Sequence, residues 1–229
     1  MADMTEENMK LTIFGASGGI GRQLLDQALA AGHGVTAVVR NPDGLPDGAR
    51  IVRADLAAPD DAAVDTALQG ADAVLSSLGP RSRKDVGIAS QGTRTILEAM
   101  DATGVRRIVV VSAAPIGTVP SPGRPTPPEH DPGDGFFMRH LLTPLVKMAL
   151  RKPYADLAVM EDVVRASDLD WTVIRPPRLT DKPPTGKHRI AYGHNVRGGL
   201  TISRADVAHV MLDVLNRPEA IKQTVGVAY

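Results

Sequence analysis

The chain has 229 residues, a length that favours one large α/β domain over two independent ones. Its 26 basic and 26 acidic residues balance, so it lacks the surplus positive charge that drives binding to a nucleic-acid backbone, and we expect no nucleic-acid partner. Cysteine is absent, which excludes disulfides, thiolate metal sites and a cysteine nucleophile, and fits a cytoplasmic protein. We expect neither a secretory signal in the polar N-terminus nor a membrane partner.

In chain order, apolar runs alternate with segments of helical periodicity, the pattern of a parallel sheet covered by helices. Short buried strands are predicted at 11–14, 35–39, 51–52, 73–75, 108–111, 171–174 and 225–227. Helices are predicted at 20–31, 62–68, 88–100, 137–150, 154–167 and 204–215, the last opened by a capping box of Ser203 and Asp206. This order predicts a Rossmann-type, doubly wound, mostly parallel sheet, with residues 1–229 forming a single domain.

Residues 115–135 interrupt this alternation with seven prolines, and we expect an irregular loop over a site. The segment 136–150 is apolar on almost every side, and Pro144 should kink any helix in it. Core packing, a lid over an apolar substrate, a subunit interface and docking on a membrane surface all remain open for this segment. Residues 180–200 are expected to form a loop or hairpin, and 115–200 to hold a small substrate-covering region. The oligomeric state is left open.

Glycines at positions 15, 18 and 21 follow the first predicted strand and open the first predicted helix. Gly15 allows a tight turn, Gly18 lets the backbone approach a diphosphate, and Gly21 lets the helix pack closely on the strand. Amide groups at the helix N-terminus then face the phosphates, where the helix dipole is positive. A glycine-rich turn without a ligand is the alternative, but the strand before and the helix after favour a dinucleotide. The predicted contacts in this loop are Gly15, Ser17, Gly18, Gly19, Ile20 and Gly21.

Arg40 ends the second predicted strand, at a place where an NAD-preferring site usually carries an acidic side chain. A guanidinium there would bind the 2′-phosphate of NADP, so the sequence predicts NADP(H) as the cofactor, with a solvated surface arginine as the alternative. Asp55 and Leu56, after the third strand, complete the predicted adenosine contacts. The carboxylate of Asp55 suits the adenine amine, although it could equally cap the turn before Pro59.

Four segments resemble the atypical short-chain dehydrogenase/reductases, in the NAD(P)-binding group that includes NmrA-like proteins and biliverdin-IXβ/flavin reductase. These segments are Phe14–Gly21, Val38–Pro42, Asp170–Pro177 and Ser203–Ala208. The resemblance covers nearly the whole chain except 115–150. It implies that the nicotinamide half of the cofactor lies against the ends of strands four, five and six, at Ser77, Leu78, Gly79, Ser112, Ala113, Pro176 and Pro177.

Typical members of this superfamily pair a tyrosine with a lysine four residues later, but here Tyr154 is followed by Ala158. Without that cation a tyrosine titrates at about 10, which weakens proton donation to an ordinary carbonyl. In the flavin reductase branch a serine, matched by Ser112, and a histidine flank the nicotinamide, and Glu161 stands at the histidine's position. We predict that Ser112, Tyr154 and Glu161 are the catalytic residues lining the substrate pocket, with pairing of Glu161 to Arg165 as the alternative.

Reduction of a flavin or of biliverdin requires mainly the placement of two ring systems, because the conjugated ring accepts hydride itself. The sequence therefore predicts an NADPH-dependent oxidoreductase whose partner is a small conjugated acceptor, such as a flavin, a quinone or a polyketide-like aromatic. A redox-sensing NADP(H)-binding regulator without turnover, of the NmrA-like type, is the main alternative, and a non-redox isomerase is the third. His130, His188 and His194 lack metal-ligand spacing, so no metal site is expected.

Overall fold

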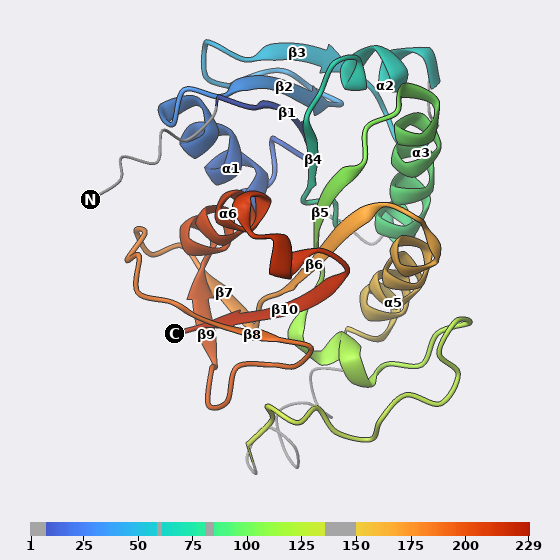
Figure 1. Cartoon of the computed structure of the whole chain (residues 1–229), viewed down its shortest axis with the longest axis vertical. Coiled ribbons are helices and arrows are strands. Elements are labelled where there is room, and N and C mark those ends of the chain that lie inside the picture. Colours follow the sequence, from blue (N-terminus) through green and yellow to red (C-terminus); the bar gives the residue numbers. More distant parts are fainter. Residues whose placement is uncertain (1–7, 59–60, 81–84, 136–149) are drawn as a thin grey trace.

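The computed structural model describes residues 8–58, 61–80, 85–135 and 150–229. Its centre is an eight-stranded sheet in the order β3-β2-β1-β4-β5-β6-β10-β8 (Figure 1). Its strands are β1 (Lys10–Phe14), β2 (Gly34–Val39), β3 (Arg50–Arg53), β4 (Ala73–Ser76), β5 (Arg107–Val111), β6 (Asp170–Arg175), β8 (Arg189–Tyr192) and β10 (Gln223–Ala228). All neighbouring strands pair in parallel except β8, which runs antiparallel to β10. The predicted Rossmann-type, mostly parallel sheet is confirmed.

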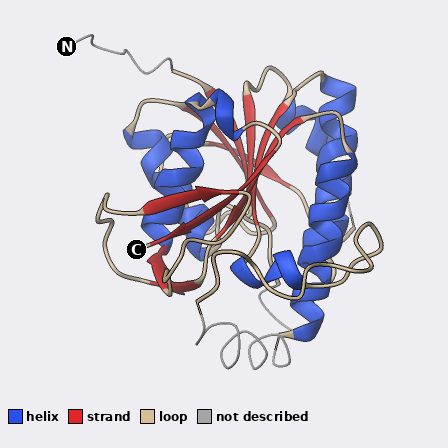
Figure 2. Ribbon diagram, turned by 60° about the horizontal axis from the view of Figure 1, so that its bottom comes forward, coloured by secondary structure: helices blue, strands red, loops and turns tan. Residues whose placement is uncertain are grey.

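Helices cover both faces of this sheet (Figure 2). On one face, α1 (Gly19–Ala30) packs against α6 (Arg204–Asp213). On the other face, α3 (Ile88–Thr103) packs against both α2 (Asp61–Leu68) and α5 (Arg151–Ala166). Strands covered on both sides need apolar residues without alternation, and all four residues of β4 are accordingly buried.

Two apolar cores lie on the two faces of the sheet. Leu24 of α1 and Val207 of α6 belong to the first core. Met100 of α3 belongs to the second, together with Trp171 and Val173 of β6. Trp171 is 8% exposed and Val173 is fully enclosed. The carboxyl ends of the parallel strands stay uncovered by these cores, and ligands of such sheets bind there.

The region predicted to cover the substrate is not one continuous unit. Within 115–200, α5 and β6 belong to the helical layer and to the main sheet. The part before them starts with a 3-10 turn, Ala114–Thr118, and continues irregularly to residue 135, as its prolines predict. The alternatives raised for the apolar segment 136–150 concern residues that, apart from residue 150, lie outside the described ones.

The part after β6 differs from the expected loop or hairpin. Short strands β7 (Arg178–Thr180) and β9 (Thr201–Ser203) pair in parallel with each other, and β8 between them is the edge strand of the main sheet. Two 3-10 turns, Val214–Asn216 and Pro218–Ala220, connect α6 to β10. Within the described ranges, no helix combines the length and apolar character needed to cross a membrane.

Candidate functional site

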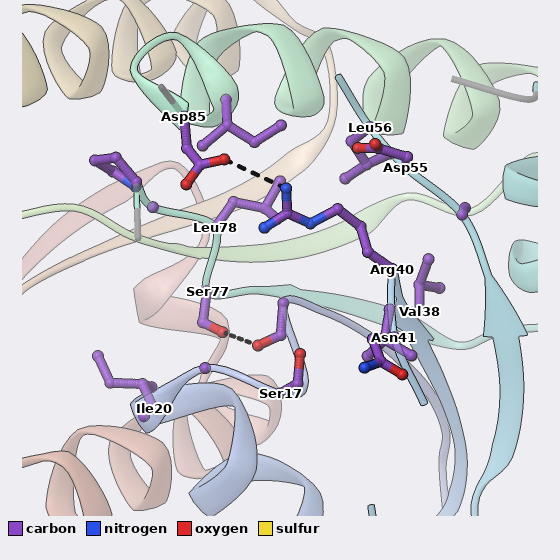
Figure 3. A pocket seen from close by; sticks show the side chains of 18 of the residues that line it. Ser17, Ile20, Val38, Arg40, Asn41, Asp55, Leu56, Ser77, Leu78 and Asp85 are labelled. Atoms are coloured by element: carbon purple, nitrogen blue, oxygen red, sulfur yellow. Dashed lines mark hydrogen bonds and ion pairs between the residues drawn. The ribbon is translucent and has the colours of Figure 1, made fainter. Parts of the chain in front are cut away.

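A cavity of about 530 Å³ opens where β1, β2, β3 and β4 end (Figure 3). Its wall combines the β1–α1 loop, the residues that follow β2, β3 and β4, and the start of α3. Eleven of the predicted cofactor contacts line it: Gly15, Ser17, Gly18, Gly19, Ile20, Arg40, Asp55, Leu56, Ser77, Leu78 and Gly79. Residues from four separate strand ends thus meet around one space.

The β1–α1 loop has the geometry expected of a phosphate-binding turn. Gly15 has a φ of +74°, a conformation that favours glycine, and its carbonyl accepts the Gly18 N–H at 2.8 Å. Gly18 is the N-cap of α1 and has no side chain that could occupy the first amide groups of the helix. A Cβ on Gly21 would lie 2.1 Å from the Gly15 carbonyl oxygen, so only glycine lets the helix pack here. Gly21 supports the loop from behind and does not line the cavity. A diphosphate fits this cradle chemically.

Ser77 joins the end of β4 to this loop. Its backbone N–H donates to the Phe14 carbonyl at 3.1 Å, and its hydroxyl lies 3.3 Å from the carbonyl oxygens of Phe14 and Gly15. Figure 3 marks the contact of the Ser77 hydroxyl with the loop by a dashed line. The hydroxyl therefore fixes the turn from the neighbouring strand.

Arg40 reaches across the cavity from the end of β2. Its guanidinium lies 3.3 Å from the carboxylate of Asp85, just before α3, and Figure 3 shows the two side chains facing each other. The Arg40 side chain is 47% exposed, while Asp85 is 20% exposed. The Arg53 guanidinium donates to the Arg40 carbonyl at 3.2 Å and steadies its backbone. The arginine thus presents positive charge to the cavity with an acidic partner beside it.

Asp55 follows β3, and its position bears on both interpretations raised from the sequence. It lines the cavity, and its carboxylate accepts the Ala57 N–H at 3.1 Å, which caps the turn that follows β3. Leu56 is nearly buried beside it, and a Cβ on Gly92 of α3 would lie 3.3 Å from the Leu56 Cβ. The glycine in α3 lets this helix approach the cavity wall closely.

The remaining predicted cofactor contacts lie at the joined ends of β5 and β6. The Ser112 N–H donates to the Ile174 carbonyl at 2.8 Å, and the Ala114 N–H donates to the Pro176 carbonyl at 2.9 Å. Ser112, Ala113, Pro176 and Pro177 are not part of the wall of this cavity. The residues predicted to contact the adenosine and the diphosphate therefore line one cavity or support its loop, and Ser77, Leu78 and Gly79 line the same cavity.

Glu161 is the centre of a buried charge cluster. Its carboxylate accepts hydrogen bonds from the Ser112 hydroxyl at 2.6 Å, from Arg175 at 2.9 and 2.5 Å, and from Arg165 at 2.7 Å. Burial raises the pKa of Glu161, but the bonds and charges of Arg175 and Arg165 outweigh it and hold the pKa below its usual value. Because Glu161 has no exposed surface, its placement matches the ion-pair alternative, not a carboxylate open to a substrate.

Tyr154 lies apart from this cluster, near the start of α5. It is 9% exposed and packs with Ile116 and Ala158 in a small apolar group. Burial raises the pKa of the Tyr154 hydroxyl above its ordinary value. Of the three predicted catalytic residues, the structure brings Ser112 and Glu161 together, whereas Tyr154 faces a different environment.

Nine residues that line the cavity were not assigned to the cofactor from the sequence, and Asn41, Asp85, Leu179 and Arg204 are among them. Leu179 and Arg204 come from the C-terminal part of the chain, so no local motif links them to the glycine loop. The capping box of Ser203 and Asp206 was the available signal, because it places Arg204 at the first position of a helix; the structure confirms the cap, with the Ser203 hydroxyl accepting the Asp206 N–H. Across the described residues, no group of three or more potential metal ligands occurs.

Comparison with known proteins agrees with this geometry. The sequence profile of the NAD(P)H-binding family matches residues 15–218. An uncharacterized protein of Mycobacterium tuberculosis is 40% identical over 106 residues, which are 46% of this chain and 12% of that protein. This chain therefore spans only a small part of the length of that relative.

Two solved structures show the likeness of fold. A short-chain dehydrogenase/reductase of Veillonella parvula in complex with NADP has a TM-score of 0.76 at 17% identity, over 96% of this chain and 94% of that one. ChuY, described as an anaerobilin reductase of Escherichia coli O157:H7, has a TM-score of 0.74 at 23% identity, over 96% of each chain. These likenesses show the fold that the resemblance to the atypical short-chain dehydrogenase/reductases implied, and the profile match shows the family. The chain belongs to the NAD(P)H-binding family.

Proposed function

We propose that this chain is an NADPH-dependent oxidoreductase that transfers hydride to a small conjugated acceptor, such as a flavin, a quinone or a polyketide-like aromatic. The observation that carries the proposal is the cavity at the strand ends, where a glycine loop with an open helix N-terminus and the guanidinium of Arg40 face the same space. NADP in the Veillonella parvula structure supports the choice of cofactor, because that protein shares the fold.

The residues of the chain would divide the binding task by chemical group. The amides at the start of α1 would hold the diphosphate, and Ser77 would keep the loop in place. Arg40 would bind the 2′-phosphate, exchanging its exposed pair with Asp85 for a doubly charged acceptor. Bound NADPH supplies the hydride. The acceptor would take its proton from water, since its conjugated ring can carry the developing charge.

The surroundings of Tyr154 support an acceptor that needs no strong proton donor. Ala158 occupies the position of the usual lysine and is fully enclosed, so no cation stands there to assist the hydroxyl. Burial raises the pKa of Tyr154, which makes it a poorer acid near neutral pH. An ordinary alcohol or ketone would need that proton transfer, whereas a flavin or quinone would not.

A redox-sensing regulator without turnover is the second candidate, and one observation favours it. Ser112 and Glu161, the two predicted catalytic groups that meet, are committed to a closed cluster with Arg175 and Arg165. A protein that only binds NADP(H) would have no need of an accessible group at this place.

One assay separates the two candidates. The full chain is mixed with NADPH and, in turn, with FMN, a set of small quinones and anaerobilin, the last because of the likeness to ChuY. Loss of the absorbance of reduced nicotinamide above the protein-free rate is the expected result. The Arg40→Ala variant should need more NADPH for the same rate. Arg50 is the exposed first residue of β3, at the end of the strand away from the cavity, and Arg50→Ala should behave as the wild type.

The outcomes are distinct. Saturable binding of NADPH without consumption by any acceptor would reject the oxidoreductase and support the regulator. Absence of binding to either reduced dinucleotide would reject both candidates.

A further inference from the structure

Arg204, the first residue of α6, lies against the phosphate loop. It lines the cavity, and α6 packs beside α1 on one face of the sheet (Figure 1). A Cβ built on Gly19 would lie 2.6 Å from the Arg204 Cδ and 2.7 Å from its Nε. The end of the Arg204 side chain, from Cδ to Nε, therefore lies next to Gly19 in the first turn of α1.

This contact explains a glycine that the phosphate-loop motif does not require. The motif uses positions 15, 18 and 21, and Gly19 is simply the first helical residue of α1, outside the left-handed region. Backbone conformation therefore tolerates a side chain at position 19. A Cβ at this position would instead displace the end of the Arg204 side chain, so the loop and the arginine fit each other as long as residue 19 is glycine.

Buried hydrogen bonds hold the backbone around Arg204 in place. Asp206, fully buried, accepts the hydroxyls of Ser203 and Tyr229 and the N–H groups of Thr185 and Gly186. This network fixes the first turn of α6 and the loop before β8 in one arrangement. The position from which the arginine extends is thus set by buried bonds.

The guanidinium itself keeps capacity for a ligand. Its Nη1 donates to the Asp181 carboxylate at 2.5 Å, but Asp181 is 87% exposed and the Arg204 side chain is 31% exposed. A guanidinium carries five N–H donors, and an exposed ion pair contributes little energy, so a second anion can be accepted without breaking a buried pair. The nearest place for that anion is the loop on which the arginine lies.

We propose that Arg204 binds the diphosphate common to NADPH and NADH, as a second cation beside the amides of α1. The proposal rests on the proposed function in so far as the ligand is a nicotinamide dinucleotide. It gives the two arginines of the cavity different tasks: Arg40 reads the 2′-phosphate that only NADPH carries, and Arg204 holds the part that both cofactors share.

Calorimetric titration of single variants tests this division. Arg204→Gln should weaken both NADPH and NADH by roughly tenfold, and by the same factor, because a hydrogen bond to a charged group is lost in each complex. Arg204→Lys should recover part of the loss. Arg40→Ala should weaken NADPH alone. Arg217→Gln makes the same charge change on the surface just beyond α6, next to Asp213, and should leave both affinities unchanged.

A double-mutant cycle tests the contact between Arg204 and Gly19. Gly19→Ala should push the arginine off the loop and weaken both cofactors as Arg204→Gln does, and the double variant should be no weaker than either single one. Circular dichroism and the urea midpoint of each variant confirm that the chain is folded.

Three results would overturn the inference. These are wild-type affinity of Arg204→Gln for both cofactors, a loss confined to NADPH, and full additivity of Gly19→Ala with Arg204→Gln. If the wild type binds neither cofactor, the proposed function fails as well. If the wild type binds and only the Arg204 and Gly19 variants behave as wild type, this inference alone fails.

Discussion

At the scale of single residues, Glu161 shows how a full charge is kept inside the protein. Two arginines and the Ser112 hydroxyl supply donors to both of its oxygens. Taking a carboxylate out of water is costly unless it is paired and hydrogen-bonded, and the pKa of Glu161 is held low by these partners. The cluster joins the ends of β5 and β6 to α5, so it stabilises the strand ends beside the cavity.

Glu161→Gln should therefore lower the free energy of unfolding by roughly 3 kcal/mol, because it leaves Arg175, 4% exposed, without its counter-charge. Urea unfolding measures this. Glu98→Gln on the exposed side of α3 is the matched control and should change stability by less than about 0.5 kcal/mol. Equal stability of the two variants would contradict the role given to the cluster.

A residue's role can be predicted from the sequence when it depends on neighbours along the chain, but not when it depends on residues distant in sequence. Gly15, Gly18 and Arg40 follow from local rules, since each marks the end of a predicted strand or the start of a helix. Arg204 could not be assigned in this way, because its role depends on a contact with Gly19 across the fold. For Glu161, the sequence offered two interpretations, and only the positions of Arg175 and Arg165 distinguish them.

At the scale of elements, α5 supplies the N-terminal cap of α3. The carboxylate of Asp156, on α5, accepts the N–H groups of Gly87, Ala89 and Ser90, each at 3.1 Å. The N-cap residue of α3 is Gly87, which has no side chain for this purpose. A buried aspartate from a neighbouring helix therefore satisfies the donors that a helix start leaves unpaired, and it complements the helix dipole.

Asp156→Ala should destabilise the chain by about 2 kcal/mol, the upper range for loss of a helix cap, because buried N–H groups lose their acceptor. The urea midpoint provides the measurement. Asp101→Ala, at an exposed position on α3, should cost far less. If the two variants unfold at the same urea concentration, the cap has no energetic role.

The lowered pKa of Asp206 predicts that the protein loses stability in acid. Burial raises its pKa, but bonds from Tyr229, Gly186, Thr185 and Ser203 lower it from 3.8 to about 2. A carboxyl with a depressed pKa stabilises the fold above its unfolded value, and this contribution disappears as the pH falls from about 4 toward 2.

The difference in unfolding free energy between wild type and Asp206→Asn should thus be about 2 kcal/mol at pH 7 and shrink steadily below about pH 4. Tyr229→Phe removes one donor and should show a smaller difference with the same pH dependence. A difference that stays constant down to about pH 2 would contradict this assignment.

The elements that the sequence predicted are those with strong periodicity. Short apolar runs identified the parallel strands, α1 was found because its apolar residues repeat at helical spacing, and α6 was found from its capping box. The short strands β7, β8 and β9 have three or four residues each and few buried ones. Their formation depends on partners distant in sequence, such as β10 for β8, and no local pattern signals those.

At the scale of the whole molecule, two apolar cores hold the sheet between helices and leave its carboxyl edge free for a ligand. The cavity at this edge is built from residues near both ends of the described chain, from Gly15 to Arg204. A ligand that binds there should stabilise the entire fold, by about 2.7 kcal/mol at a concentration one hundred times its dissociation constant.

The most direct test of the account is calorimetric titration of the full chain with NADPH and NADH. We expect one saturable site, with NADPH roughly tenfold tighter than NADH, and we expect that preference to disappear in Arg40→Ala. Saturable binding of both cofactors with equal affinity in the wild type would contradict the role of Arg40. No saturable heat with either cofactor would contradict the assignment of the cavity as a dinucleotide site.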